Sequence, residues 1–133
     1  MNSKVAQALL LPFLVACCES AFAQKLYWTE QGVDAVSRSN LDGSAKETLL
    51  RNPLRNPDGI AIDPATDTVF WSDDMGDAVI RSASADGSNI QLVYSVSSTH
   101  EITDLAFEQI GRKLYFVDDG PPHDAIYRMN PDG

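Results

Sequence analysis

The chain has 133 residues, 44% of them hydrophobic and 22% charged, and its formal net charge at pH 7 is −9. This acidic balance disfavours nucleic acid and anionic membrane surfaces as partners, because both carry negative charge. The acids are spread among turn segments rather than gathered in a tail, so most of them are interpreted as a solvated surface.

The N-terminal segment has the pattern of an export signal. A weakly basic start is followed by an apolar run over Val5–Ala16, and Ala21-Phe22-Ala23 offers small residues at the positions that a signal peptidase reads. The apolar run is too short to span a bilayer stably, so no transmembrane helix is expected. We predict a signal peptide over residues 1–23, cleavage after Ala23, and a secreted or periplasmic mature chain over residues 24–133.

A lipid anchor is the alternative interpretation of the same segment. Leu14-Val15-Ala16-Cys17 resembles the lipobox of bacterial lipoproteins, in which the cysteine is lipidated. Cleavage after Ala23 is favoured, because the first predicted strand begins at Lys25 and a lipoprotein usually keeps a longer tether. That cleavage removes both Cys17 and Cys18, so the mature chain would contain no disulfide.

One short pattern of residues occurs three times. Leu26-Tyr27-Trp28-Thr29-Glu30 is echoed by Val69-Phe70-Trp71-Ser72-Asp73 after 43 residues, and by Leu114-Tyr115-Phe116-Val117-Asp118 after another 45. Each copy is followed by Asp-Ala, a Val or Ile, one further residue and an Arg, and each then closes on Asp-Gly. A period in the low to mid forties, made of short apolar strands and turns, is typical of propeller blades with about four strands each.

The middle copy is the only complete one. It predicts four strands over Ile60–Ile62, Val69–Ser72, Ala78–Arg81 and Gln91–Tyr94, separated by turns rich in Gly, Pro and Asp. The first copy has no room for an opening strand after the export signal. The third copy has an opening strand over Ile102–Phe107 and a longer turn over Asp118–Asp124. We therefore predict an all-β chain that forms about two and a half four-stranded blades of a partial β-propeller.

These residues resemble the YWTD repeat, also called the low-density lipoprotein receptor class B repeat. Its pattern is Tyr-Trp-Thr-Asp, a short turn, Ile-x-Arg and then Leu-Asp-Gly-Ser, and residues 26–44 fit it best, whereas the third copy has lost the Trp and the hydroxyl residue. The positions that carry the resemblance are Tyr27, Trp28, Glu30, Arg38, Asp42, Gly43, Phe70, Trp71, Asp73, Arg81, Asp86, Gly87, Tyr115, Asp118 and Arg128.

The resemblance implies a six-bladed propeller that serves extracellular recognition and ligand release. Six blades at this period would need about 260 residues, so the chain is expected to be the N-terminal part of a longer protein whose missing C-terminal blades complete the ring. The alternative is a short chain whose subunits complete a ring together.

The repeated acids and arginines have a structural and a catalytic interpretation. Glu30, Asp73 and Asp118 stand at strand ends, and an Arg follows each of them one strand later. A catalytic site is normally unique, whereas a structural device recurs in every blade, so we predict an acid–Arg pair that joins adjacent strands. Trp28 and Trp71 are predicted to be core residues between blades.

No catalytic or metal-binding motif is recognised. The turn acids Asp73, Asp74 and Asp77, and likewise Asp118, Asp119 and Asp124, could bind Ca²⁺ through oxygen ligands, but they lack the spacing of a calcium loop. Asp is also an ordinary turn residue, so no cofactor is predicted. His100 and His123 are single histidines in predicted loops and are interpreted as surface residues.

Two functions follow from these patterns. The favoured one is an exported, non-catalytic module that binds a protein or glycan ligand through loops at the rim, with Asp119, His123 and Asp124 of the long turn as the candidate ligand-facing residues. The alternative is a calcium-dependent lactonase of the gluconolactonase type. Pro57-Asp58-Gly59 is similar to turns in that class, and Asp58 would then be a metal ligand; the simpler interpretation is a turn that leads into the next strand.

Overall fold

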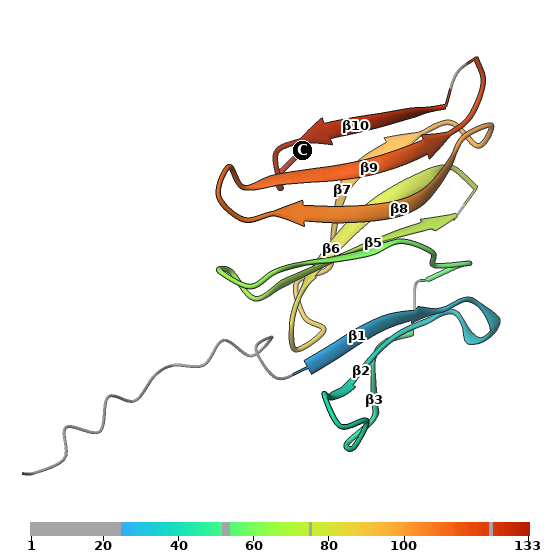
Figure 1. Cartoon of the computed structure of the whole chain (residues 1–133). Helices are drawn as coiled ribbons and strands as arrows, with labels where there is room; N and C mark the ends of the chain where they lie inside the picture. The colour runs from blue at the N-terminus through green and yellow to red at the C-terminus, as the bar shows by residue number, and fades with distance from the viewer. Residues whose placement is uncertain (1–24, 52–53, 75, 123) are drawn as a thin grey trace, which may run out of the picture.

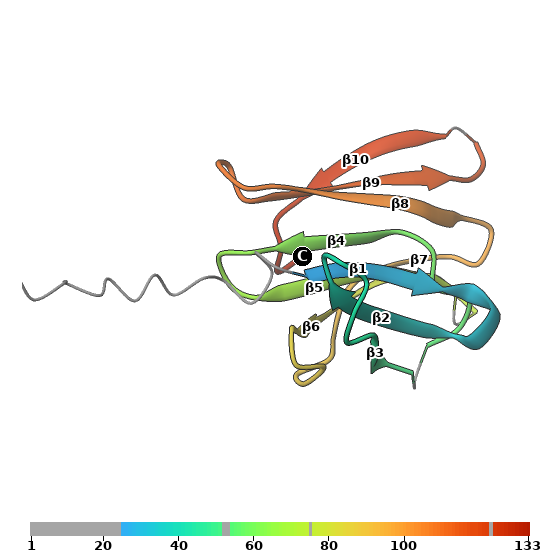
Figure 2. The ribbon, with the colours of Figure 1, turned by 60° about the horizontal axis from the view of Figure 1, so that its bottom comes forward.

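The computed structural model describes residues 25–51, 54–74, 76–122 and 124–133. These residues form three antiparallel sheets, which lie one beside the next in chain order (Figure 1; Figure 2). Sheet 1 has the strand order β1-β2-β3, sheet 2 has β4-β5-β6-β7, and sheet 3 has β10-β9-β8. The elements are β1 (Lys25–Glu30), the short 3₁₀ helix η1 (Gln31–Val33), β2 (Ala35–Asn40), β3 (Glu47–Leu50), β4 (Ile60–Asp63), β5 (Thr68–Asp74), β6 (Ala78–Ser84), β7 (Gln91–Val96), β8 (Glu101–Glu108), β9 (Lys113–Asp119) and β10 (Ala125–Met129).

The prediction of an all-β chain with about two and a half blades is confirmed. The four strands predicted for the middle repeat are present as β4 to β7, and each begins at the predicted residue or one residue before it. Asp-Gly turns close the β2–β3 and β6–β7 hairpins with Gly43 at a φ of 80° and Gly87 at 84°. Glycine adopts this left-handed conformation at little cost, which explains why the repeat ends on this residue.

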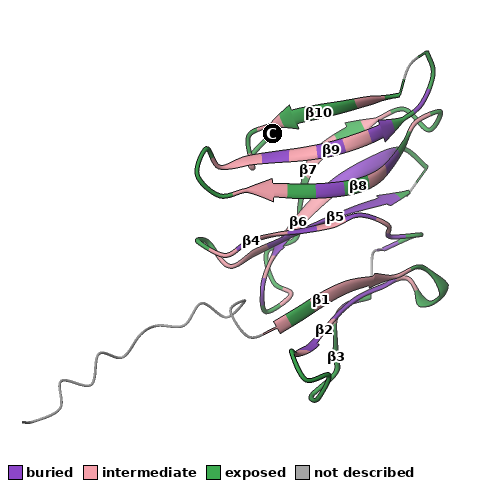
Figure 3. Cartoon of the chain, in the orientation of Figure 1, coloured by how far each residue is buried: buried purple, intermediate pink, exposed green. Residues whose placement is uncertain are grey.

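Strand β5 is buried on both of its faces. Val69, Phe70 and Trp71 are exposed by only 0%, 2% and 1%. A strand with apolar side chains at consecutive positions needs a covering layer on each side, which a single sheet cannot supply. Sheet 2 obtains these layers from sheet 1 and sheet 3, and Figure 3 shows the buried residues concentrated where the sheets face one another.

Adjacent aromatic residues of the repeat point to opposite faces of their sheet. Trp71 belongs to the core cluster between sheets 1 and 2, whereas Phe70 belongs to the cluster between sheets 2 and 3 and stacks on Phe107 with ring centroids 5.8 Å apart. By the same alternation Tyr27 packs against the first cluster and Phe116 lies in the second. At each interface between neighbouring sheets, which we call a joint, each of the two sheets therefore contributes an aromatic ring to the core.

Trp28 does not lie between any two of the described sheets, so its predicted place between blades stays a prediction. Trp71 is buried as predicted, but Trp28 is half-buried and lies in neither core cluster. Its ring lies under the Lys46 ammonium group, with Nζ 5.2 Å from the ring centroid. The reason is geometric: the alternation that sends Tyr27 towards sheet 2 sends Trp28 to the opposite face of sheet 1, where no further described sheet packs.

The segment that leads into β4 is held by both neighbouring sheets. The Asp58 amide donates to the Ser72 carbonyl oxygen at 3.1 Å, the Thr29 hydroxyl donates to the Asp58 carbonyl oxygen at 2.6 Å, and the Asn56 amide donates to the Asp34 carboxylate at 2.8 Å. A Cβ on Gly59 would lie only 2.8 Å from the Asp104 Cα in sheet 3. The Pro-Asp-Gly sequence is thus a turn into β4, as its simpler interpretation predicts, and it also joins three sheets.

Candidate functional site

A pocket of about 260 Å³ opens between sheets 2 and 3, at the edge that lies on the right in Figure 1. It is lined from the turn before β4, the end of β5, the β7–β8 connection and the end of β9. Five carboxylate residues line it, and we call it the acidic pocket: Asp58, Asp73, Asp74, Glu101 and Asp119.

Of the five carboxylates of the acidic pocket, only Asp73 has an ion-pair partner among the described residues. No ion pair among the described residues involves Asp58, Asp74, Glu101 or Asp119. Burial raises the pKa of Asp58 above its ordinary value, and the nearby Asp104 carboxylate raises it further. Carboxylates held close together repel one another. A cation that enters the pocket reduces this repulsion, so its binding is electrostatically favourable.

Asp73 is the buried member of this set. Its side chain is fully buried, its Oδ2 accepts a hydrogen bond from Trp71 Nε1 at 3.1 Å, and the same oxygen lies 3.4 Å from Arg81 Nε. Its Oδ1 has no hydrogen-bond partner among the residues that the structure describes. Burial raises the pKa of Asp73, and the contacts with Trp71 and Arg81 oppose that rise only in part.

His100 lines the acidic pocket, and its ring is hydrogen-bonded to Asp118, a residue that does not line the pocket. Its Nδ1 lies 2.7 Å from the Asp118 Oδ1, and the Asp118 side chain is only 4% exposed. A carboxylate accepts hydrogen bonds, so Nδ1 carries the proton and donates. Gly120 lies against the same ring, because a Cβ there would be 2.6 Å from His100 Nδ1. His100 is therefore an oriented, half-buried group and not the free surface residue that the sequence suggested.

Among the described residues, the predicted acid–Arg pair forms in the middle repeat and not in the other two. In the first repeat Glu30 accepts a hydrogen bond from the Ser37 hydroxyl, while Arg38 pairs with Glu47 at 2.7 Å. In the third repeat His100 takes the place that the prediction gave to Arg128, whose side chain is exposed. Strand β3 supplies Glu47 and the β7–β8 connection supplies His100, and neither partner belongs to the repeated motif.

The long turn of the third repeat contributes one residue to the pocket. Asp119 lines the acidic pocket, and Asp124 is exposed just before β10. His123 lies outside the described residues. The ligand-facing role predicted for these three residues stays a prediction, and the sequence did not single out Glu101, which lies one residue after His100.

The turn acids act as backbone caps in two of the repeats. Asp42 accepts from the Ser44 amide at 2.9 Å, and Asp86 accepts from the Ser88 amide at the same distance. These bonds lower the pKa of both carboxyl groups, with the serine hydroxyl as the largest cause. Within the described ranges no group of three or more His, Cys, Asp or Glu side chains is arranged to hold a metal ion.

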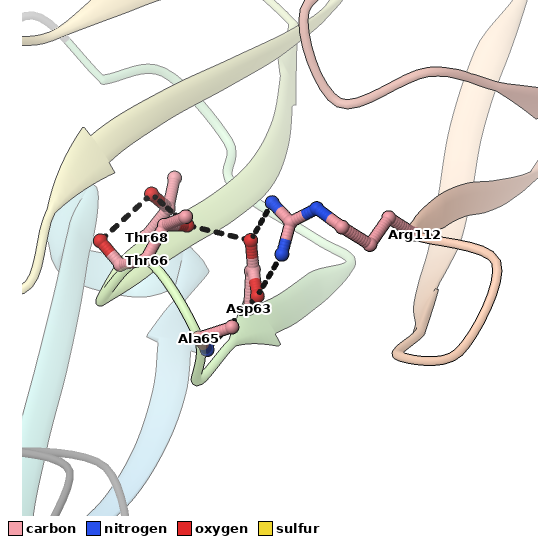
Figure 4. Close-up of polar contacts among 5 residues, drawn as sticks. All are labelled: Asp63, Ala65, Thr66, Thr68 and Arg112. Carbon is pink, nitrogen blue, oxygen red and sulfur yellow. Dashed lines mark hydrogen bonds and ion pairs between the residues drawn. The ribbon is translucent and has the colours of Figure 1, made fainter.

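A larger groove of about 640 Å³ lies at the opposite strand ends, and two of the charged residues that line it, Asp63 and Arg112, are paired with each other. Asp63 is 1% exposed, and its carboxylate accepts two hydrogen bonds from the Arg112 guanidinium group (Figure 4). Nη2 donates to Oδ2 at 2.6 Å and Nη1 donates to Oδ1 at 3.3 Å. The Thr66 hydroxyl and the Ala65 amide complete its hydrogen bonds. This bidentate pair connects sheet 2 to sheet 3, and the sequence repeat gave no signal of it.

The Asp63–Arg112 pair makes stability depend on pH. Burial by itself raises the pKa of Asp63, but the bonds from Thr66 and Arg112 outweigh it and lower the pKa below its ordinary value. The stabilisation is therefore present at neutral pH and is lost as the pH falls through the lowered pKa. Because Arg112 is 42% exposed, we expect Asp63→Asn to cost only about 1–2 kcal/mol at pH 7.

Urea unfolding at pH 7 and at pH 3 measures this effect. The difference between wild type and Asp63→Asn should shrink at the lower pH, because below about pH 3.9 the unfolded chain binds a proton at Asp63 more readily than the folded chain does. Asp42→Asn is the control, since that exposed aspartate caps only its own turn. An equal difference at both pH values would contradict the role given to the charge of Asp63.

No helix among the described residues is long and apolar enough to cross a membrane.

Comparison with known proteins agrees with the repeat and the fold. Residues 24–64 match the low-density lipoprotein receptor repeat class B. Protein cueball of Drosophila sechellia is 37% identical over 87 residues, which is 62% of this chain and 13% of that protein. Protein cueball of Drosophila willistoni is 30% identical over 99 residues, 71% of this chain and 15% of that protein. The chain thus spans less than a sixth of these relatives.

Solved structures show the same architecture. A chain in the crystal structure of a nidogen/laminin complex superposes with a TM-score of 0.74 at 24% identity, over 84% of this chain and 42% of that chain. The putative TolB of Agrobacterium tumefaciens gives a TM-score of 0.68 at 16% identity, over 84% of this chain and 43% of that chain. Both are β-propellers. The chain therefore belongs to the proteins that carry low-density lipoprotein receptor class B repeats, and its three sheets are blades of the β-propeller type.

Proposed function

We propose that the chain is part of an exported, non-catalytic β-propeller that binds a protein ligand through the edge carrying the acidic pocket. The observation that carries this proposal is a pocket between two blades in which four of the five carboxylates have no ion-pair partner among the described residues. Charged groups left unpaired at a loop-lined edge are suited to steering and binding an oppositely charged partner. The similarity to a propeller in a nidogen/laminin complex supports a protein, rather than a glycan, as the ligand.

Export is the second part of the proposal. We assign residues 1–23 as the signal peptide and residues 24–133 as propeller blades, with the remaining blades of a six-bladed ring supplied by more of the same protein. A lipid anchor on Cys17 is the alternative. N-terminal sequencing of the exported protein separates the two, because cleavage after Ala23 leaves Gln24 as the first residue, whereas a lipoprotein begins at Cys17.

A hydrolase is less well supported by the described residues. His100 and Asp118 resemble the base and orienting acid of a hydrolytic site, but no serine or threonine hydroxyl and no cysteine thiol among the described residues hydrogen-bonds to the His100 ring. Ser97 and Thr99, its neighbours in the chain, bond to each other at 3.0 Å. Asp58, the expected metal ligand of a lactonase, belongs to no group that could hold a metal within the described ranges.

The test is a binding experiment paired with an activity assay. The exported full-length protein is immobilised and exposed to purified extracellular proteins, laminin included, and we expect saturable binding of at least one of them. An unrelated immobilised protein of similar net charge is the control for non-specific attraction. Lactone hydrolysis that a chelator abolishes, with no saturable protein binding, would overturn the proposal in favour of the lactonase.

A further inference from the structure

We infer that the acidic pocket binds a lysine or arginine side chain of the ligand, and that His100 is one of the residues that contact it. This inference rests on the proposed function, because it names the chemical group by which a protein ligand would enter the site. The argument depends on which hydrogen-bonding groups the pocket offers, on how His100 is held, and on an unsatisfied oxygen in its wall.

Four of the five carboxylates of the pocket have no ion-pair partner among the described residues. An ionised carboxylate accepts hydrogen bonds and cannot donate them, and five carboxylate residues line a volume of about 260 Å³. A lysine ammonium group has three donors and no acceptor, and an arginine guanidinium group has five donors and no acceptor. A long basic side chain is therefore complementary to the pocket in charge and in hydrogen bonding, and its apolar stem can lie along the pocket wall.

His100 adds a further acceptor with a fixed orientation. Its Nδ1 donates to Asp118 at 2.7 Å, and Gly120 closes the same side of the ring, so Nε2 lies on the side away from both residues. In the neutral ring Nε2 carries no proton and accepts a hydrogen bond. The buried Asp118 thus fixes the tautomer in which His100, a residue of the pocket wall, can accept a hydrogen bond from a ligand N–H group.

Asp73 adds one unsatisfied acceptor atom to the wall of the pocket, although its other carboxylate oxygen is bonded to Trp71 and paired with Arg81. The residue lines the pocket and is 4% exposed, and its Oδ1 has no hydrogen-bond partner among the described residues. A buried acceptor without a donor destabilises the folded chain, so a donor that reached it would be favoured. Three carboxylates outside the pocket are already engaged, since Asp63 binds Arg112 and Asp42 and Asp86 cap their own turns.

Acetyl-arginine amide is the probe for this site, and acetyl-citrulline amide is its neutral match in shape. Titration of the full chain with the arginine compound, followed by ¹⁵N NMR of the His100 ring, should give a saturable shift at Nε2. We expect the citrulline compound to bind at least tenfold more weakly, because its urea group carries no charge. In Glu101→Gln/Asp119→Asn the affinity for acetyl-arginine amide should fall at least fivefold.

A matched variant separates the pocket from the overall charge of the chain. Asp42→Asn/Asp86→Asn removes the same two negative charges from capped turns outside the pocket, and it should leave the affinity unchanged within twofold. Equal losses in the two double variants would show that only the net charge attracts the probe, and equal binding of the citrulline compound would show that charge is not recognised. Either result overturns the inference.

The result can also be told apart from failure of the proposed function. If the full-length protein binds its protein ligand equally well with Glu101→Gln/Asp119→Asn, the binding function stands and the basic-side-chain assignment is wrong. If acetyl-arginine amide binds in the pocket while no extracellular protein binds, the pocket assignment stands and the protein-recognition function is wrong.

Discussion

Trp71→Ala should lower the free energy of unfolding by about 3–5 kcal/mol, because it empties a buried aromatic site in a close-packed joint. Trp71 is 1% exposed and packs among the apolar residues of the cluster between sheets 1 and 2. Its Nε1 also donates to the buried Asp73 carboxylate, which would lose its hydrogen-bond donor. Urea unfolding followed by circular dichroism measures the loss without depending on tryptophan fluorescence.

Trp28→Ala is the matched control, because Trp28 has the same place in its repeat. Its ring is half-buried and faces Lys46 rather than a neighbouring sheet, so we expect a cost of only about 1 kcal/mol. If the two substitutions cost the same, the assignment of Trp71 alone to the joint between described sheets would be wrong.

Gly59→Ala should destabilise the chain by about 3 kcal/mol by forcing sheets 2 and 3 apart. An added Cβ would lie 2.8 Å from the Asp104 Cα, 2.9 Å from the Asp104 carbonyl carbon and 2.9 Å from the Leu105 nitrogen. All three are backbone atoms of β8, so no rotamer change can move them away. The substitution should also shift the Phe70 and Phe107 ring resonances in NMR spectra, because these rings stack across the same joint.

Gly32→Ala tests whether this effect is specific to the joint. Gly32 lies in η1, and an added Cβ would find no atom within 4 Å. We expect this variant to be neutral or stabilised by up to about 0.5 kcal/mol, because alanine restricts the unfolded chain more than glycine does. A loss of stability in Gly32→Ala as large as that in Gly59→Ala would mean that the contact with Asp104 is not the cause.

The turn residues and strands were predictable because their causes are local. Alternating turns and apolar runs predicted β4 to β7 to within a residue at their starts, and the Asp-Gly positions predicted turns that need a positive φ. The side-chain partners were not predictable in the same way. Asp118 was expected to pair with Arg128 but binds His100, and Arg38 binds Glu47 rather than Glu30.

The amino-acid sequence by itself determined the repeat, the four-stranded plan of its complete copy and the family, because periodicity, turn chemistry and β-propensity act over a few neighbouring residues. Only the tertiary structure decided which neighbouring sheet each aromatic ring of the repeat packs against, that Arg112 reaches Asp63, and that Asp58, His100, Glu101 and Asp119 line one pocket. These relations depend on how one sheet is set against the next. That placement results from packing between residues some 40 to 60 positions apart, which no local pattern records.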